Sequence, residues 1–436
     1  MARGDRPAVS SAQTGRQAVE AVWRIESARI VGALARLTGD FALAEDLAQE
    51  ALAEALVAWP RDGVPRSPAG WLLTVGRRRA IDAYRRRSAL DERYAAFARD
   101  LDEGGATSGG LPESAGPHAD LLWDPDRIDD DVLALMFISC HPILSREASV
   151  ALTLRVVGGL TSEEIARVFL VQTTAVQARI TRAKRTLAAA QVPFEMPPVD
   201  ERRTRLSSVL SVLYLIFTEG STATSGTELI RADLAREAVR LARILARVVP
   251  DEPETHGLLA LLELTSSRFP ARVRDDGEPI LLEQQDRRRW DRSAIRRGQA
   301  ALARAALVGR GLGAYGLQAA IAECHAVAPS VDETDWERIV LLYEALGRLA
   351  PSPVVELNKA VAISVAQGPA AALPLVDDLV AAGNLSSSHL LPSVRGELLT
   401  RLGRTDEARH ELELAVRLCR NERERDLLER KIAELA

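Results

Sequence analysis

Residues 173–187 combine an apolar stripe with polar and cationic side chains at helical spacing. The apolar stripe consists of Val176, Ile180, Ala183 and Leu187. The polar and cationic positions are Thr174, Gln177, Thr181, Arg182, Lys184 and Arg185, and the segment has no acidic residue. A helix of this kind can insert polar and cationic side chains into the major groove of DNA while its apolar stripe packs on preceding helices. An ordinary basic surface helix is the alternative.

The residues before this segment predict a second, shorter helix. Thr161 and Glu164 have the spacing of a capping box, in which each side chain accepts a hydrogen bond from the other residue's backbone. We expect Ile165 and Ala166 to face inward. A tight connection from Phe169 to Gln172 then leads into a helix that starts at Thr173. Two helices joined this closely predict a helix-turn-helix.

A second cationic segment lies nearer the amino terminus. Its arginines are Arg66, Arg77, Arg78, Arg79, Arg85, Arg86 and Arg87. Its single acid is Asp82, which we expect to pair with Arg78 or Arg85, and Trp71 and Tyr84 lie between the arginines. Arginines neutralise phosphates and aromatic rings stack on unpaired bases, so the pattern is typical of single-strand binding. A solvated charged face is the alternative.

An acidic segment precedes the cationic one. Asp46, Gln49 and Glu50 occur at positions i, i+3 and i+4, flanked by Glu45 and Glu54. Such a stripe on one helix face could bind a basic surface of a partner protein, or it could simply be solvated.

Catalytic and metal-binding motifs are missing. The sequence has no Walker loop, HExxH or GxSxG motif, and its six histidines are scattered. Cys140, Cys324 and Cys419 are isolated thiols without metal-ligand spacing. We therefore expect no enzyme, no cofactor and no metal.

The composition indicates an all-α protein. The chain has 436 residues, 47% of them hydrophobic but only 4% aromatic, and Ala, Leu and Arg dominate. The formal net charge is −5, but the charge is unevenly spread, so nucleic-acid binding is not excluded. No apolar run approaches the ~20 residues of a membrane-spanning helix, and the amino terminus lacks a signal-peptide core. We expect a cytoplasmic protein without membrane contact.

The predicted elements place these segments on separate helices. Asp40 predicts a helix start and Trp59-Pro60 its end, and a loop from Pro60 to Gly70 precedes a basic helix over 71–87. Residues 103–117, rich in Gly, Ser and Pro, predict a flexible linker. The predicted parts are a polar leader (1–16), a first helical domain (17–90), a linker region (91–127), a helix-turn-helix domain (128–192) and a helical extension (200–436).

The extension contains a weak internal repeat. Ala372, Val376 and Leu379 share their spacing with Ala408, Leu412 and Ala415. Small–large–small spacing of this kind lets the helices of a hairpin pack closely, as in tetratricopeptide repeats. Generic packing in an Ala-rich helical domain is the alternative.

In combination, these segments resemble the sigma-70 family of bacterial transcription initiation factors, and within it the small extracytoplasmic-function (ECF) group, which keeps only regions 2 and 4. Residues 37–51 are similar to the core-binding part of region 2, and 67–87 to its promoter-melting and −10-reading part. Residues 160–184 are similar to region 4. Segments 214–220 and 282–291 look like the long, tetratricopeptide-like extension of one ECF subgroup.

The resemblance implies partners and residue roles. The partners are the RNA polymerase core, through its β′ clamp helices and β flap, and promoter DNA, as a −35 duplex and a single-stranded −10 element. Asp46, Gln49 and Glu50 would bind the core. Trp71, Arg77, Arg78, Asp82, Arg85 and Arg86 would bind and melt the −10 element. Thr174, Gln177, Thr181, Arg182, Lys184 and Arg185 would bind the −35 duplex.

The extension could fold over regions 2 and 4, or bind a signalling protein or peptide. Asp286 to Asp291 is a candidate contact, with a charged surface segment and a packed Trp290 as the alternative reading. Two other classes stay open: a free-standing helix-turn-helix regulator with a repeat-type sensor domain, and an enzyme with a DNA-binding appendage. The regulator leaves the acidic and basic helices unexplained.

Overall fold

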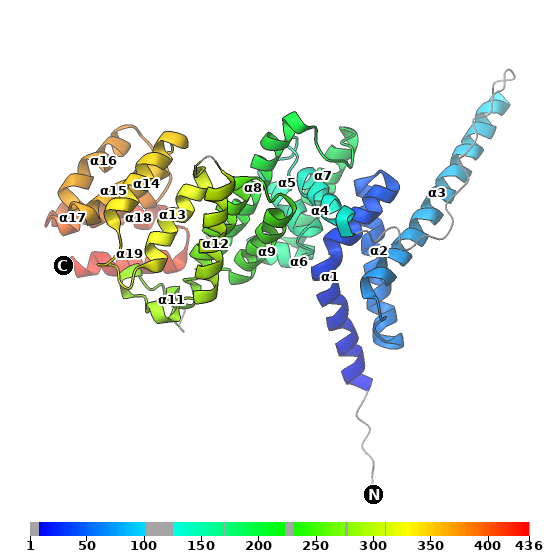
Figure 1. Cartoon of the computed structure of the whole chain (residues 1–436), viewed down its shortest axis with the longest axis horizontal. Coiled ribbons are helices and arrows are strands. Elements are labelled where there is room, and N and C mark those ends of the chain that lie inside the picture. The colour runs from blue at the N-terminus through cyan, green and yellow to red at the C-terminus, as the bar shows by residue number, and fades with distance from the viewer. Residues whose placement is uncertain are drawn as a thin grey trace, which may run out of the picture. The chain divides into compact units, whose positions relative to one another are not determined.

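The computed structural model describes residues 8–101, 125–169, 171–222, 230–274, 278–309 and 311–435. It divides into two compact units, Met1–Val209 and Leu210–Ala436 (Figure 1). The described residues form helices and one isolated bridge between Val273 and Pro279, without any named strand, so the predicted all-α fold is confirmed. The predicted linker 103–117 lies outside the described residues.

The first unit consists of seven helices and the beginning of an eighth within its described part. They are α1 (Ala8–Thr38), α2 (Phe41–Asp62), α3 (Pro68–Leu101), α4 (Pro125–Ser139), α5 (Arg146–Val156), α6 (Ser162–Phe169), α7 (Thr173–Ala189) and α8 (Val199–Ser221).

The start of α2 is fixed by the signal seen in the sequence. The Asp40 carboxylate accepts hydrogen bonds from the backbone N–H groups of Ala42 and Leu43 at 2.9 and 3.1 Å. Gly39 has φ +65°, a left-handed conformation that lets α1 end immediately before α2 begins. The predicted end at Trp59-Pro60 is two residues too early, because α2 continues through Pro60 to Asp62.

Two other boundaries differ from the sequence prediction. Helix α1 starts at Ala8, inside the expected leader 1–16, and α3 runs to Leu101, well beyond Arg87. Residues 88–101 are mostly Ala, Leu, Arg, Glu and Asp, without Gly or Pro, so nothing local stops the helix at Arg87.

One part of the core of the first unit lies between α1, α2 and α3, which pack on one another (Figure 1). Ile30, Leu34, Trp59 and Leu72 are among its most deeply buried side chains. Helix α4 packs on α1 and α5, and the ion pair between Arg36 and Asp131 (3.0 Å) joins α1 to α4. Helices α5, α6 and α7 form the second group in this unit.

The second unit contains the rest of α8 followed by helices that mostly pack on their chain neighbours. They are α9 (Ala232–Val248), α10 (Pro253–Ser266), α11 (Phe269–Arg272), α12 (Arg292–Val308), α13 (Ala314–Val327), α14 (Trp336–Leu349), α15 (Pro353–Ala366), α16 (Pro369–Ala381), α17 (Leu390–Arg401), α18 (Thr405–Leu418) and α19 (Glu422–Glu434), with 3₁₀ turns η2 (Leu282–Gln284) and η3 (Arg287–Arg289).

The repeated positions of the extension are all buried. Ala372, Val376 and Leu379 on α16 face α15 and α17, in one core with Leu357 and Leu398. On α18, Ala408, Leu412 and Ala415 are at most 2% exposed. The spacing therefore marks the inner faces of helices, which both a repeat and generic packing in an Ala-rich helical domain predict.

The segment from Asp286 to Asp291 contains a packed tryptophan. Trp290 is 2% exposed, and the guanidinium carbons of Arg268 and Arg287 lie 5.5 and 4.7 Å from its ring centroid. Arg287 is buried and donates to the carbonyl oxygens of His325 and Ala328, both at 2.6 Å. Only its exposed neighbours, such as Arg288, are accessible to a partner.

Candidate nucleic-acid and polymerase-binding surfaces

Helices α6 and α7 form the predicted helix-turn-helix. The Thr161 hydroxyl accepts from the Glu164 N–H at 3.1 Å, and the Glu164 carboxylate accepts from the Thr161 N–H at 2.8 Å, so the capping box is confirmed. Ile165 and Ala166 are buried, and α7 begins at Thr173 as expected. The buried residues of α7 are Val176, Ile180, Ala183 and Leu187, the predicted stripe.

The opposite face of α7 is exposed to solvent. Its exposed residues include Thr174, Gln177, Thr181, Arg182 and Arg185. Within the described residues neither Arg182 nor Arg185 forms an ion pair, and both side chains are exposed to solvent. Gln172, at the start of α7, makes no side-chain cap, so the first backbone N–H groups of the helix receive no side-chain acceptor from it.

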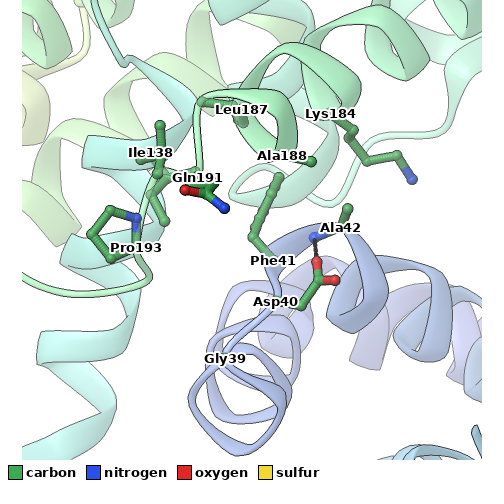
Figure 2. Close-up of a pocket in the computed structure, with 11 residues that line it drawn as sticks. Gly39, Asp40, Phe41, Ala42, Ile138, Lys184, Leu187, Ala188, Gln191 and Pro193 are labelled. Atoms are coloured by element: carbon green, nitrogen blue, oxygen red, sulfur yellow. Dashed lines mark hydrogen bonds between the residues drawn. The ribbon is translucent and has the colours of Figure 1, made fainter. Parts of the chain in front are cut away.

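Lys184 differs from the other predicted −35 residues because its ammonium group contacts α2. Lys184 Nζ lies 2.7 Å from Oε2 of Glu45 and 2.6 Å from Oδ1 of Asp46. Figure 2 shows Lys184 beside a cavity of about 390 Å³ that is lined from α2 by Phe41 and Ala42 and from α7 by Leu187. A predicted DNA-binding residue thus pairs with a predicted core-binding residue.

The Lys184 contact is well shielded from water. The exposed fraction of the side chain is 16% for Lys184 and 5% for Glu45. Desolvation by itself would lower the pKa of Lys184, but the attraction of Glu45 and the hydrogen bonds to both carboxylates outweigh it and raise the pKa. Lys184 is therefore charged throughout the physiological range, and so held by α2.

Glu45 is a buried charged residue that the sequence pattern did not single out. It appeared only as a flank of the acidic stripe, yet it is buried and lies 3.5 Å from Arg155 on α5 as well as close to Lys184. Its helical register points it away from the exposed face of Asp46 and Glu50. The spacing Ala44, Ala48, Ala51 in the sequence marks this buried face of α2, which is the one signal that could have found it.

The predicted core-binding residues lie on one helix but in different surroundings. Asp46 is 64% exposed despite its contact with Lys184, and Gln49 is partly buried. Glu50 is exposed and lies 2.8 Å from Arg79 of α3. The acidic stripe is therefore accessible, but each of its two carboxylates already has an intramolecular cation.

Glu54 connects the acidic helix to the basic one. Its carboxylate pairs with Arg78 at 2.9 Å and with Arg79 at 2.8 Å. The hydrogen bond from Arg79 is the main cause that lowers the pKa of Glu54, with Arg78 adding to it against the effect of burial. The expected pairing of Asp82 with Arg78 or Arg85 is wrong: Arg78 is drawn across to α2, and no ion pair of Asp82 occurs in the described part of the chain.

The predicted −10 residues form a mostly exposed cationic face on α3. Arg78, Asp82, Arg85 and Arg86 are exposed, and Arg77 is partly buried. Trp71 is half-buried, and its ring meets that of Trp59 edge to face, with centroids 5.7 Å apart. Tyr84 donates its hydroxyl to the Thr38 carbonyl oxygen at 2.7 Å, which ties α3 to the end of α1.

No helix in the described part of the chain is both long and apolar enough to cross a lipid bilayer. No solved structure matches the chain.

Three family comparisons match separate parts of the chain. Residues 24–89 match Sigma-70 region 2, and residues 134–187 match Sigma-70, region 4. Residues 205–306 match a family of unknown function, DUF6596. The two sigma matches cover the acidic and basic helices and the helix-turn-helix, and the third covers the first half of the second unit.

A curated relative matches over almost the full length. It is the uncharacterized protein R00370 of Rhizobium meliloti (strain 1021), 43% identical over 419 residues, which are 93% of this chain and 93% of the relative. The chain therefore belongs to the family of this Rhizobium protein, and it carries regions 2 and 4 of a sigma-70-type transcription initiation factor followed by a helical domain of unknown function.

Proposed function

We propose that this protein is an ECF-type sigma factor that binds the RNA polymerase core, directs it to specific promoters and helps to melt the −10 element. The observation that supports this best is the pairing of two features in one unit: an exposed, cationic helix-turn-helix face on α7 and a separate cationic, tryptophan-bearing helix α3. A regulator that only binds duplex DNA requires the first feature and has no use for the second.

Each DNA surface has the chemistry for one form of the promoter. Thr174, Gln177, Thr181, Arg182 and Arg185 present hydroxyl, amide and guanidinium groups, which read base edges and phosphates in a major groove. On α3, Arg77, Arg78, Arg85 and Arg86 would follow the backbone of the separated strand, and Trp71 would stack on an unpaired base. Melting is favoured because this binding energy offsets the lost base stacking.

The polymerase core is the proposed partner of α2. Asp46, Gln49 and Glu50 would face a basic surface of the core, the β′ clamp helices, while the helix-turn-helix domain would approach the β flap. Arg79 and Lys184, which now neutralise Glu50 and Asp46, must then give way to cations of the polymerase. No catalytic role is part of this proposal, and the place of action is the cytoplasm, where the polymerase core is found.

The extension is proposed to regulate the sigma regions. Its stacked helices, with inner faces of Ala and Leu, are suited to present an extended surface to a signalling protein or peptide, as tetratricopeptide-like arrays do. The exposed Arg288 beside the packed Trp290 is one contact point on that surface.

The test is binding to purified core polymerase followed by promoter opening. The full-length protein is compared with a chain that ends at Pro198, before α8. We expect both chains to bind the core. Promoter opening is measured by the permanganate reactivity of unpaired thymines in the −10 element. If neither chain binds the core while the full-length chain still binds duplex DNA, the protein is a free-standing helix-turn-helix regulator and the proposal fails.

The same experiment assigns the sign of the extension. If only the full-length chain opens the promoter, the extension is required for activity. If only the shorter chain opens the promoter, the extension is a built-in inhibitor.

A further inference from the structure

Three side chains with metal-ligand atoms lie together in the second unit. Nε2 of His389 is 3.2 Å from Oε2 of Glu424, and Sγ of Cys419 is 4.0 Å from the same oxygen. The three ligand atoms all lie within 4.8 Å of one another. One nitrogen, one sulfur and one oxygen atom therefore lie close enough together to be ligands of one ion.

The three residues come from the ends of three different helices. His389 directly precedes α17, Cys419 directly follows α18, and Glu424 is in the first turn of α19. Hydrogen bonds to the backbone of all three residues hold them in place. The Cys419 N–H donates to Ala415 O at 2.9 Å, the Ser393 N–H donates to His389 O at 3.0 Å, and the Glu424 N–H donates to the capping side chain of Asn421 at 3.3 Å. The convergence is thus produced by helix ends, which have defined geometry.

The donor set and its spacing suit Zn²⁺. Zinc is bound by thiolate, imidazole and carboxylate at about 2.0–2.3 Å, and tetrahedral geometry then puts ligand atoms about 3.3–3.8 Å apart. The separations of 3.2 Å (Nε2–Oε2) and 4.0 Å (Sγ–Oε2) lie just outside this range, and the three atoms are within 4.8 Å of one another, so side-chain movement is needed to complete the geometry. A thiolate and a carboxylate also neutralise the charge of a divalent ion.

The surroundings combine shielding with access. Cys419 is 5% exposed and belongs to an apolar cluster with Leu412, Ala415 and Leu428. The side chains of His389 and Glu424 are each 24% exposed, so an ion can enter from solvent and keep a water molecule as its fourth ligand. Three protein ligands and one open position distinguish such a site from a closed structural zinc site.

We propose that His389, Cys419 and Glu424 bind one Zn²⁺ ion, with water in the fourth position, and that the ion joins the ends of α17, α18 and α19. Binding forms one bond each from Sγ, a histidine nitrogen and a carboxylate oxygen to the metal, and the proton of the Cys419 thiol is released to solvent. An ion pair already joins two of these helices, because Lys431 on α19 lies 2.5 Å from Glu397 on α17.

The test is titration of the full-length, tag-free protein with Co²⁺, a spectroscopic substitute for Zn²⁺, followed by displacement with Zn²⁺. Wild type should bind one Co²⁺ with a thiolate-to-metal charge-transfer band that Zn²⁺ abolishes. Cys419→Ser should lose the band. Glu424→Gln should weaken the affinity at least about 10–100-fold, the loss that even outer-shell substitutions cause at metal sites.

Matched controls separate this site from adventitious binding. Cys324→Ser removes another buried thiol of the same unit, and His410→Gln removes an exposed histidine on α18. Both should bind like wild type, and far-ultraviolet circular dichroism checks that each variant is folded. A Co²⁺ band that survives in Cys419→Ser, or a wild-type chain that shows no Zn²⁺-displaceable band, would overturn the proposal.

Hydrogen exchange gives a second readout. Zn²⁺ should slow amide exchange at the start of α17 and around residues 419–426, and a chelator should reverse this. The same exchange rates with and without Zn²⁺ would overturn the proposal and leave an ordinary contact between His389 and Glu424 beside a packed thiol.

Discussion

Replacing Lys184 with Met is the most informative single change, because this residue joins the two predicted binding surfaces. Methionine keeps the length and apolar stem of the side chain and removes the charge. The substitution breaks the contacts of 2.7 Å to Glu45 and 2.6 Å to Asp46 and leaves Glu45 with Arg155 alone, at 3.5 Å.

The size of the effect follows from the burial of this contact. A hydrogen bond to a charged group contributes about 1.5–3 kcal/mol to stability, and the hydrogen bond from Lys184 to Glu45 is shielded from water. Asp46 is mostly exposed, so its share is small. A loss of about 2 kcal/mol corresponds to roughly a 30-fold weaker contact between α2 and α7.

The assay is the affinity for core polymerase in the absence of DNA. If the contact of Lys184 competes with the core for Asp46, the apparent dissociation constant falls in Lys184→Met, because a larger fraction of the protein is competent to bind. The fall should be at most about 5-fold, since only the exposed Asp46 share of the contact, about 1 kcal/mol or less, is in competition. Arg182→Met is the matched control: it removes an exposed cation from the same helix without touching α2, and should leave core affinity unchanged.

A second measurement detects the contact itself. Spin labels at the exposed positions 53 on α2 and 178 on α7, in a chain whose three native cysteines are replaced by serine, should report a longer or broader distance in Lys184→Met. A contact that opens while core affinity stays constant would refute the role of Asp46 in core binding. Equal effects of both methionine variants would refute the competition.

Three further predictions concern the DNA surface, the core of the helix-turn-helix and the pH dependence. Arg185→Ala should weaken binding to the −35 duplex by ~1–3 kcal/mol if Arg185 reads a base. If Arg185 contacts a phosphate instead, the affinity should fall equally on all DNA sequences and the slope of log affinity against log salt should decrease by about one. Binding isotherms at several salt concentrations distinguish the two outcomes, and unchanged binding would exclude Arg185 from the DNA surface. Ile180→Ala should lower the free energy of unfolding of the first unit by about 2–5 kcal/mol, since Ile180 is 6% exposed. Urea unfolding measures this loss, which is smaller if neighbouring side chains move in to fill the cavity. The pKa of Glu54 is lowered in the folded state, so its contribution to the free energy of unfolding should be fully present above the unfolded-state pKa of about 4.3. This contribution should disappear as the pH falls through the lower pKa of the folded state. In Glu54→Gln, the free energy of unfolding measured against pH should lack this loss at acidic pH.

Local signals in the sequence determined the elements of the helix-turn-helix. The reciprocal hydrogen bonds of Thr161 and Glu164 need only residues three apart, and the stripe on α7 follows from helical periodicity. The start of α2 at Asp40 is local for the same reason. The start of α1 and the end of α3 were misjudged. Residues 8–16 are polar and contain Gly15, a composition typical of a leader, and residues 88–101 contain no Gly or Pro that marks a helix end.

Tertiary structure decided which charges meet. Asp82 lies at helical spacing from Arg78 and Arg85, but Arg78 pairs with Glu54 because α2 packs along α3. Lys184 and Asp46 are more than one hundred residues apart, and His389 and Cys419 belong to different helices, so neither pair is visible as a spacing. An ion pair or a metal site depends on distances of a few ångströms between side chains, and sequence periodicity gives the face of a helix but not the helix that lies against it.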